Sequence, residues 1–75
     1  MSNEEKMELL AEMLEIEVEN LSGEMRLDEI DEWDSFARLS FMSLVDENFG
    51  KLITSADIKQ LKTVSDLLAI MMESD

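Results

Sequence analysis

The chain lacks cysteine, histidine, proline and tyrosine, and it contains only two glycines among its 75 residues. Without cysteine it can form neither a disulfide nor a thiolate zinc site, and without histidine it lacks the commonest general base and metal ligand. Independent catalysis is therefore not expected. A chain this short has room for one thin core, so residues 1–75 are predicted to form a single domain.

Basic residues are also scarce, with six against 19 acidic residues and a net charge of −13. Such a charge argues against a nucleic acid partner. It suits a basic protein partner, whose approach it would accelerate by long-range attraction, although it also simply keeps a small domain in solution. Residues 1–34 hold 13 acidic and two basic residues, a net −11, whereas residues 35–75 hold six and four, a net −2. The first half therefore supplies the negative field.

Long hydrophobic runs are missing too. No apolar run approaches the roughly 20 residues that a membrane span needs, and the polar, acidic start of the chain does not resemble a signal peptide. The sequence therefore predicts a cytoplasmic monomer without a membrane span.

Capping signals indicate where helices begin. Three capping boxes pair a hydroxyl residue with an acid three positions later: Ser2 with Glu5, Thr54 with Asp57, and Thr63 with Asp66. With the hydrophobic periodicity they predict helices over residues 3–15, 55–60 and 64–73. A further helix is predicted from Asp34 as N-cap to about Phe49, with Gly50 as its C-terminal stop. The fold class is therefore predicted to be all-α.

Apolar spacing predicts the buried helix faces. For the first helix one candidate stripe is Leu9, Leu10, Met13 and Leu14, and a longer helix would favour Met7, Leu10, Ala11, Leu14 and Val18. We favour the shorter helix. The core face predicted for the second helix is Leu39, Met42, Val45 and Phe49, with Phe41 on the flank. The residues expected on its other side are Phe36, Ala37, Ser40, Ser43, Leu44 and Glu47. The last helix has an apolar face of Val64, Leu67, Leu68 and Met71.

Residues 16–33 are predicted to form a long connection without a clean period. A loop of this length must be held down, and the apolar residues that recur in it are the expected anchors. They are Ile16, Val18, Leu21, Met25, Leu27, Ile30 and Trp33. Trp33 fits either packing over the core or contact with a partner. After the second helix, Leu52 and Ile53 are expected to bring the chain back to the core.

The Asp34-Ser35 pair is the candidate site for chemistry. The Asp34 carboxylate can accept hydrogen bonds from the free amides of the first helical turn and complements the helix dipole. Ser35 then occupies the first helical position, where its hydroxyl is expected to be exposed and where the helix N-terminus would receive a phosphate well. Asp and Ser at a helix start can equally serve as a cap with no further function.

The order of motifs around this pair resembles the acyl carrier protein family. Its members typically have Asp-Ser-Leu at the start of the second helix, Glu-Glu-Phe-Gly at its end and a Thr-Val-Gly-Asp-like start to the last helix. The matching segments here are residues 33–36 (Trp-Asp-Ser-Phe), 47–50 (Glu-Asn-Phe-Gly) and 62–67 (Lys-Thr-Val-Ser-Asp-Leu). The likeness spans nearly the whole chain. It implies a four-helix acyl-carrier-like bundle of three longer helices and one short helix, with a long first loop.

The resemblance also implies a function. Ser35 would carry a 4′-phosphopantetheine arm, attached from coenzyme A by a phosphopantetheinyl transferase that recognises Asp34. The arm would hold acyl intermediates as thioesters and present them to acyl ligases, synthases or acyltransferases of lipid or specialised acyl metabolism, such as fatty acid biosynthesis. The protein itself would catalyse nothing. The residues expected to contact these partners are Trp33, Phe36, Ala37, Ser40, Leu44 and Glu47.

The sequence departs from the family on the second helix. Members that serve fatty acid synthesis usually carry several acids along its exposed face, whereas here only Asp46 and Glu47 remain and Arg38 adds a positive charge near the serine. The acids crowd the preceding loop instead, at Asp28, Glu29, Asp31, Glu32 and Asp34. We therefore hypothesise a specialised stand-alone carrier rather than the main fatty acid carrier.

Other functions fit parts of the same pattern. An aminoacyl or peptidyl carrier has the same fold and arm. An unmodified acidic interaction module would bind a basic partner through Phe36, Leu44 and the acidic loop, with Ser35 only part of the cap. Residues 28–34 lack the ligand spacing, central glycine and terminal glutamate of an EF-hand, so no dedicated metal site is predicted, although loose divalent ion binding remains open.

Overall fold

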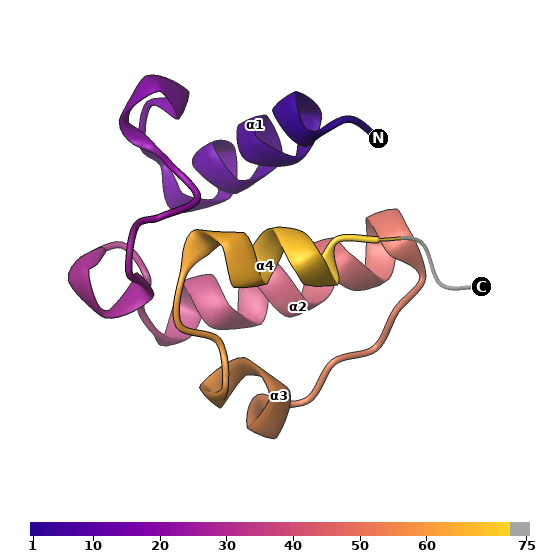
Figure 1. Ribbon diagram of the computed structural model, residues 1–75. Helices are drawn as coiled ribbons and strands as arrows, with labels where there is room; N and C mark the ends of the chain where they lie inside the picture. Colours follow the sequence, from indigo (N-terminus) through magenta and orange to yellow (C-terminus); the bar gives the residue numbers. More distant parts are fainter. Residues whose placement is uncertain (73–75) are drawn as a thin grey trace.

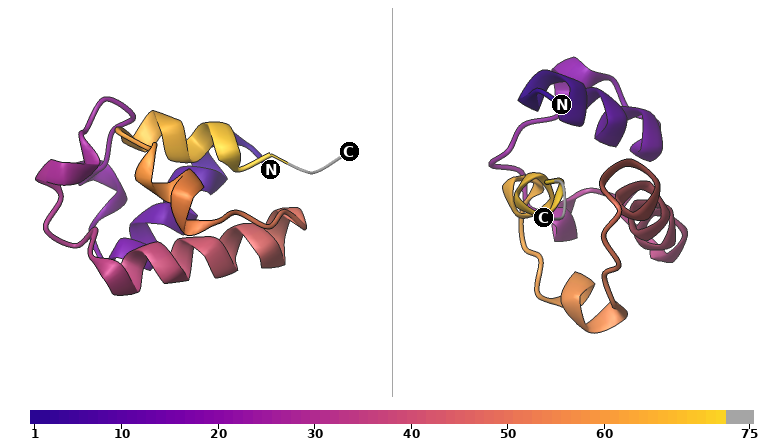
Figure 2. Two further views of the ribbon diagram at one scale, coloured as in Figure 1. Left: turned by 90° about the horizontal axis from the view of Figure 1, so that it is seen from below. Right: turned by 90° about the vertical axis from the view of Figure 1, so that its right-hand side faces the viewer.

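The computed structural model describes residues 1–72, and every regular element in this part of the chain is helical. The elements are α1 (Asn3–Leu14), the single 3-10 turns η1 (Val18–Asn20) and η2 (Leu27–Glu29), α2 (Ser35–Phe49), α3 (Ser55–Lys59) and α4 (Val64–Ile70). Helices α1 and α3 lie on opposite sides of α2 and α4 (Figures 1 and 2). The predicted all-α class is confirmed.

The helix starts follow the capping signals. All three capping boxes form, with both the hydroxyl and the acid of each box bonded to the backbone of the other. The predicted end of α2 is also confirmed, because Gly50 adopts a left-handed conformation at φ 62° that favours glycine. The last helix is shorter than the predicted residues 64–73: it ends at Ile70, and residue 73 lies outside the described residues.

The core is one cluster of apolar side chains from all four helices and the first loop. The largest side chains at its centre are fully buried: Phe41, Leu10, Leu67, Met71, Val45 and Val64. The apolar face predicted for the last helix is thus confirmed for Val64, Leu67 and Met71, and Leu68 packs against the cluster from its edge. Every helix contributes to the same core, so none can be removed without opening it.

The predicted buried face of α2 is partly wrong. The buried residues recur every four positions, at Ala37, Phe41, Val45 and Phe49. Leu39, predicted to be core, is 63% exposed, whereas Ala37, predicted to be exposed, is only 4% exposed. The reason is the direction of packing: α1 packs against α2, and the buried residues of α2 recur at every fourth position, a spacing along which packed helices interdigitate.

Two other predictions about the core, for α1 and for the segment after α2, also differ from the structure. In α1 the helix is the shorter one, but it buries Leu10, Ala11 and Leu14, while Leu9 and Met13 are half-buried. The buried residues therefore include Ala11 from the alternative stripe. After α2, Leu52 does not return to the core but is 84% exposed, and Ile53 alone packs against it.

The loop between α1 and α2 is held down by side chains and by its backbone. Six of the seven predicted anchors pack in or against the core, and Val18, at 37% exposed, does not. Residues 23–27 also run antiparallel to residues 62–65 at the start of α4. Three backbone hydrogen bonds join these segments: Leu27 N–H to Lys62 O at 2.9 Å, Val64 N–H to Met25 O at 3.0 Å, and Ser65 N–H to Gly23 O at 2.9 Å.

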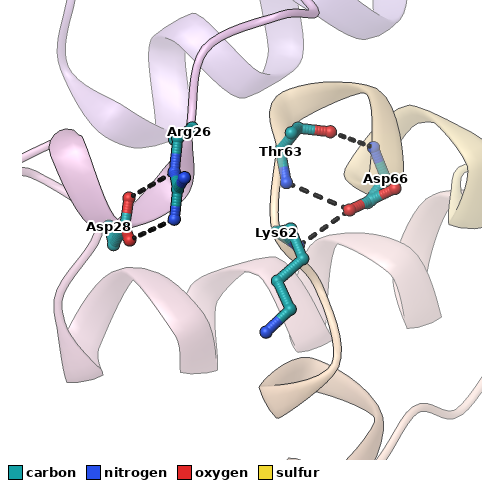
Figure 3. Close-up of polar contacts among 5 residues, drawn as sticks. All are labelled: Arg26, Asp28, Lys62, Thr63 and Asp66. Carbon is teal, nitrogen blue, oxygen red and sulfur yellow. Dashed lines mark hydrogen bonds and ion pairs between the residues drawn. The ribbon is translucent and has the colours of Figure 1, made fainter.

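Side-chain bonds reinforce both segments (Figure 3). The Asp66 carboxylate accepts hydrogen bonds from the N–H groups of Lys62 at 2.8 Å and Thr63 at 3.0 Å, and these bonds lower the pKa of Asp66. Arg26 binds the Asp28 carboxylate with two nitrogens at 2.9 and 3.2 Å, which raises the pKa of Arg26. The loop therefore reaches α2 along a fixed path.

Candidate functional site

The start of α2 is built by Asp34. Its backbone is extended, and its Oδ1 accepts a hydrogen bond of 2.9 Å from the N–H of Ala37, while its carbonyl accepts the helical bond from Arg38 at 3.0 Å. Asp34 is therefore the N-cap that the sequence predicts. The last loop bonds, from Trp33 N–H to Ile30 O and from Asp34 N–H to Glu32 O, both at 3.0 Å, fix the angle at which the chain enters the helix.

Ser35 is exposed at the first position of α2. Its Oγ accepts a hydrogen bond of 3.1 Å from Nη2 of Arg38, one helical turn further along. Within residues 1–72, no acceptor takes the proton of this hydroxyl. The oxygen is thus held by a cation while its proton is free to be removed.

A hollow of about 290 Å³ opens directly beside Ser35, between α2 and α3. Helix α3 lies along the side of α2 and α4 that faces away from α1 (Figure 1). The lining residues on α2 fall at i, i+3, i+4 and i+7 and share one face, and α3 closes the other wall. The lining is Ser35, Arg38, Leu39, Met42, Ser55, Ile58 and Lys59. The exposed Leu39 therefore forms a wall of this hollow.

A second, shallow hollow lies on the outer face of α2. It is lined by Phe36, Leu39, Ser40, Ser43, Leu44 and Glu47. Four of the six predicted partner-contact residues therefore come together on one surface: Phe36, Ser40, Leu44 and Glu47. Phe36 is its most prominent side chain at 77% exposed.

The other two predicted partner-contact residues lie elsewhere. Ala37 is buried against the core, so its side chain is not available to a partner. Trp33 is half-buried and packs against the core, with its ring 6.0 Å from that of Phe41 in an edge-on arrangement. The packing of Trp33 over the core is thus confirmed, and contact of its exposed part with a partner stays a prediction.

The sequence did not predict the wall that α3 contributes. Arg38 is visible in the sequence as a charge near the serine, and its i+3 spacing allows contact with Ser35 on a helix. Ser55, Ile58 and Lys59 come from a separate helix. Nothing in their local spacing shows that α3 docks beside the start of α2.

The chain matches no protein-family model, no curated protein and no solved structure. Within residues 1–72, every helix is too short or too polar to traverse a lipid bilayer. The same residues bring together no group of three acidic side chains that could hold a metal ion.

Proposed function

We propose that the chain is an acyl carrier protein: Ser35 carries a 4′-phosphopantetheine arm, and the four helices form an acyl-carrier-like bundle with a long first loop. The observation that carries this proposal is the exposed Ser35 hydroxyl at the start of α2, beside a hollow that runs along that helix. The chain-wide order of motifs supports the same function.

The residues around Ser35 fit such an arm. A phosphodiester on Oγ would meet the positive end of α2 and the Arg38 side chain, which already reaches that oxygen. Beyond it, Leu39, Met42 and Ile58 supply an apolar wall for the rest of a linear group. When attached, the arm supplies a terminal thiol that holds an acyl group as a thioester, chemistry that a chain without cysteine cannot supply itself.

The chain's own residues hold Ser35 in place and make it available to the transferase. Asp34 fixes the start of α2 through its bond to Ala37 N–H, and its second carboxylate oxygen is left to be recognised by the transferase. Arg38 holds Ser35 Oγ as an acceptor, which leaves the hydroxyl proton for a base on the transferase. The protein supplies position and recognition only.

The outer hollow of α2 is the proposed docking surface for acyl ligases, synthases or acyltransferases. Phe36 and Leu44 provide apolar contact, Ser40 and Ser43 provide hydroxyls, and Glu47 is the single acid in the lining. Partners that recognise a row of acids on this helix would bind such a surface weakly. This supports a specialised carrier rather than the main carrier of fatty acid synthesis.

The test is covalent loading. The purified protein is incubated with coenzyme A and a broad-specificity phosphopantetheinyl transferase, and its intact mass is measured. We expect one phosphopantetheine to be added to the wild type and to Ser22→Ala, a matched control for an exposed serine outside the hollows of α2, and none to Ser35→Ala. An unchanged wild-type mass would favour the unmodified interaction module. Charging of the loaded protein by an amino acid ligase instead of an acyl ligase would make it an aminoacyl carrier.

A further inference from the structure

The hollow beside Ser35 differs in charge from the rest of the chain. The sequence has 19 acidic and six basic residues, yet this hollow is lined by two basic residues, Arg38 and Lys59, and by no acid. Its remaining lining is apolar or carries a hydroxyl. An anionic group would therefore be attracted into this hollow and repelled from most of the remaining surface.

Neither Arg38 nor Lys59 forms an ion pair with an acid in the described part of the chain. The single ion pair within residues 1–72 joins Arg26 to Asp28. Asp28 does line an adjacent hollow together with Arg38 and Lys59, but both its oxygens accept hydrogen bonds from Arg26. Within residues 1–72 the Arg38 side chain donates one hydrogen bond, to the uncharged Ser35 hydroxyl, so four of its five guanidinium N–H groups remain for another ligand.

We infer that Arg38 and Lys59 form an anion subsite that binds the phosphodiester of the arm and directs the arm into the hollow along α2. This inference rests on the proposed carrier function. Arg38 Nη2 lies 3.1 Å from the oxygen to which the phosphorus would be bonded, so the guanidinium reaches the phosphate oxygens by a small adjustment. A planar guanidinium is suited to bind phosphate oxygens in pairs.

The acidic residues around Ser35 explain why basic side chains are useful at this position. Asp31, Glu32 and Asp34 lie in the four positions before the serine, and residues 1–34 have a net charge of −11. A phosphodiester adds another negative charge at this point. Arg38 and Lys59 offset the repulsion, and they do so at one side of the serine only. The arm is therefore drawn towards the wall formed by Leu39, Met42 and Ile58.

The two cations also separate two hollows. Arg38, Ile58 and Lys59 line both the hollow beside Ser35 and the adjacent one that contains Trp33 and Asp28. The cations therefore lie at the border of the hollow beside Ser35. A phosphate bound there leaves the apolar wall formed by Leu39 and Met42 for the rest of the arm. Arg38 is thus a positioning residue.

The test is phosphorus NMR of the loaded protein. Wild type, Arg38→Gln, Lys59→Gln and Arg38→Lys are loaded with the arm, with Lys62→Gln as a matched control for an exposed cation outside both hollows. We expect the phosphodiester resonance of the wild type to differ from that of the same sample in denaturant. It should move towards the denatured value in Arg38→Gln, less far in Lys59→Gln, and not at all in Lys62→Gln. Arg38→Lys should restore part of the shift.

A resonance that is unchanged by Arg38→Gln and Lys59→Gln in folded, loaded protein would overturn the inference and leave the carrier function intact. Failure of the wild type to gain the arm would overturn the carrier function itself, and with it this inference. The Trp33 fluorescence of each variant confirms that it is folded. Because Lys59 is exposed on a short helix, its substitution does not disturb the core, and the test remains decisive even if Arg38→Gln is poorly loaded.

Discussion

The Ser65 hydroxyl donates a hydrogen bond of 2.8 Å to the carbonyl oxygen of Gly23, 42 residues earlier in the chain. A methyl group at position 23 would lie 2.6 Å from the same Ser65 Oγ. The Ser65 side chain can rotate away only by giving up this hydrogen bond, so Gly23→Ala is expected to lower the free energy of unfolding by about 0.5–1.5 kcal/mol. Urea denaturation measures the loss. Because Ser65→Ala removes the colliding oxygen, Gly23→Ala should cost less in that background, and an equal cost would contradict the account.

Truncation of the two phenylalanines on α2, Phe41 and Phe36, should affect stability to very different extents. Phe41 is fully buried at the centre of the core, whereas Phe36 is 77% exposed. Phe41→Ala is expected to lower the free energy of unfolding by about 3–5 kcal/mol, and Phe36→Ala to change it by less than about 0.5 kcal/mol. Chemical denaturation followed by Trp33 fluorescence compares them. A large loss in Phe36→Ala would mean that its side chain is buried.

Stability should depend on pH through Asp66. Bonds from the N–H groups of Lys62 and Thr63 lower its pKa below the ordinary 3.8, so the unfolded chain takes up a proton at this site before the folded chain does. The stabilisation is therefore present above the unfolded pKa and is lost as the pH falls through the folded pKa. Asp66→Asn should be less stable than wild type at neutral pH, and the difference should shrink well below pH 3.8. A difference in melting temperature that stays constant with pH would contradict this.

Asp34 should separate folding from recognition. Asp34→Ala removes the N-cap bond to Ala37 N–H and is expected to lower the free energy of unfolding by about 1 kcal/mol. Asp34→Asn keeps an acceptor oxygen and should be nearly as stable as wild type. If the transferase recognises the carboxylate, Asp34→Asn should nevertheless be loaded more slowly, as time-resolved mass spectrometry would show. Equal loading rates would remove Asp34 from recognition and leave it as a cap only.

Local signals in the sequence were sufficient to predict where the helices begin. The cap at Thr63 depends on Asp66 three residues later, and the cap at Asp34 depends on an amide in the next turn. Both contacts form within one turn of helix, so no knowledge of the rest of the fold is needed. The end of α2 could be predicted from Gly50 in the same way, because a left-handed helix end favours glycine.

Contacts between distant segments could not be predicted in this way. Whether Ala37 or Leu39 faces the core depends on the direction from which α1 approaches α2, and hydrophobicity alone favours the larger residue. The hydrogen bonds between residues 23–27 and 62–65 join backbone groups, so they do not show in the pattern of apolar and polar side chains. For the same reason Ser35 could be selected from the sequence, whereas Lys59, which comes from another helix, could not.

The central claim is that Ser35 carries the arm, and the most direct measurement is the mass of the protein purified from cells that produce it. After proteolysis, the peptide that contains Ser35 should carry one 4′-phosphopantetheine, and the other serine-containing peptides should be unmodified. A peptide found only with an unmodified Ser35, in protein that purified transferase and coenzyme A also leave unchanged, would contradict the account.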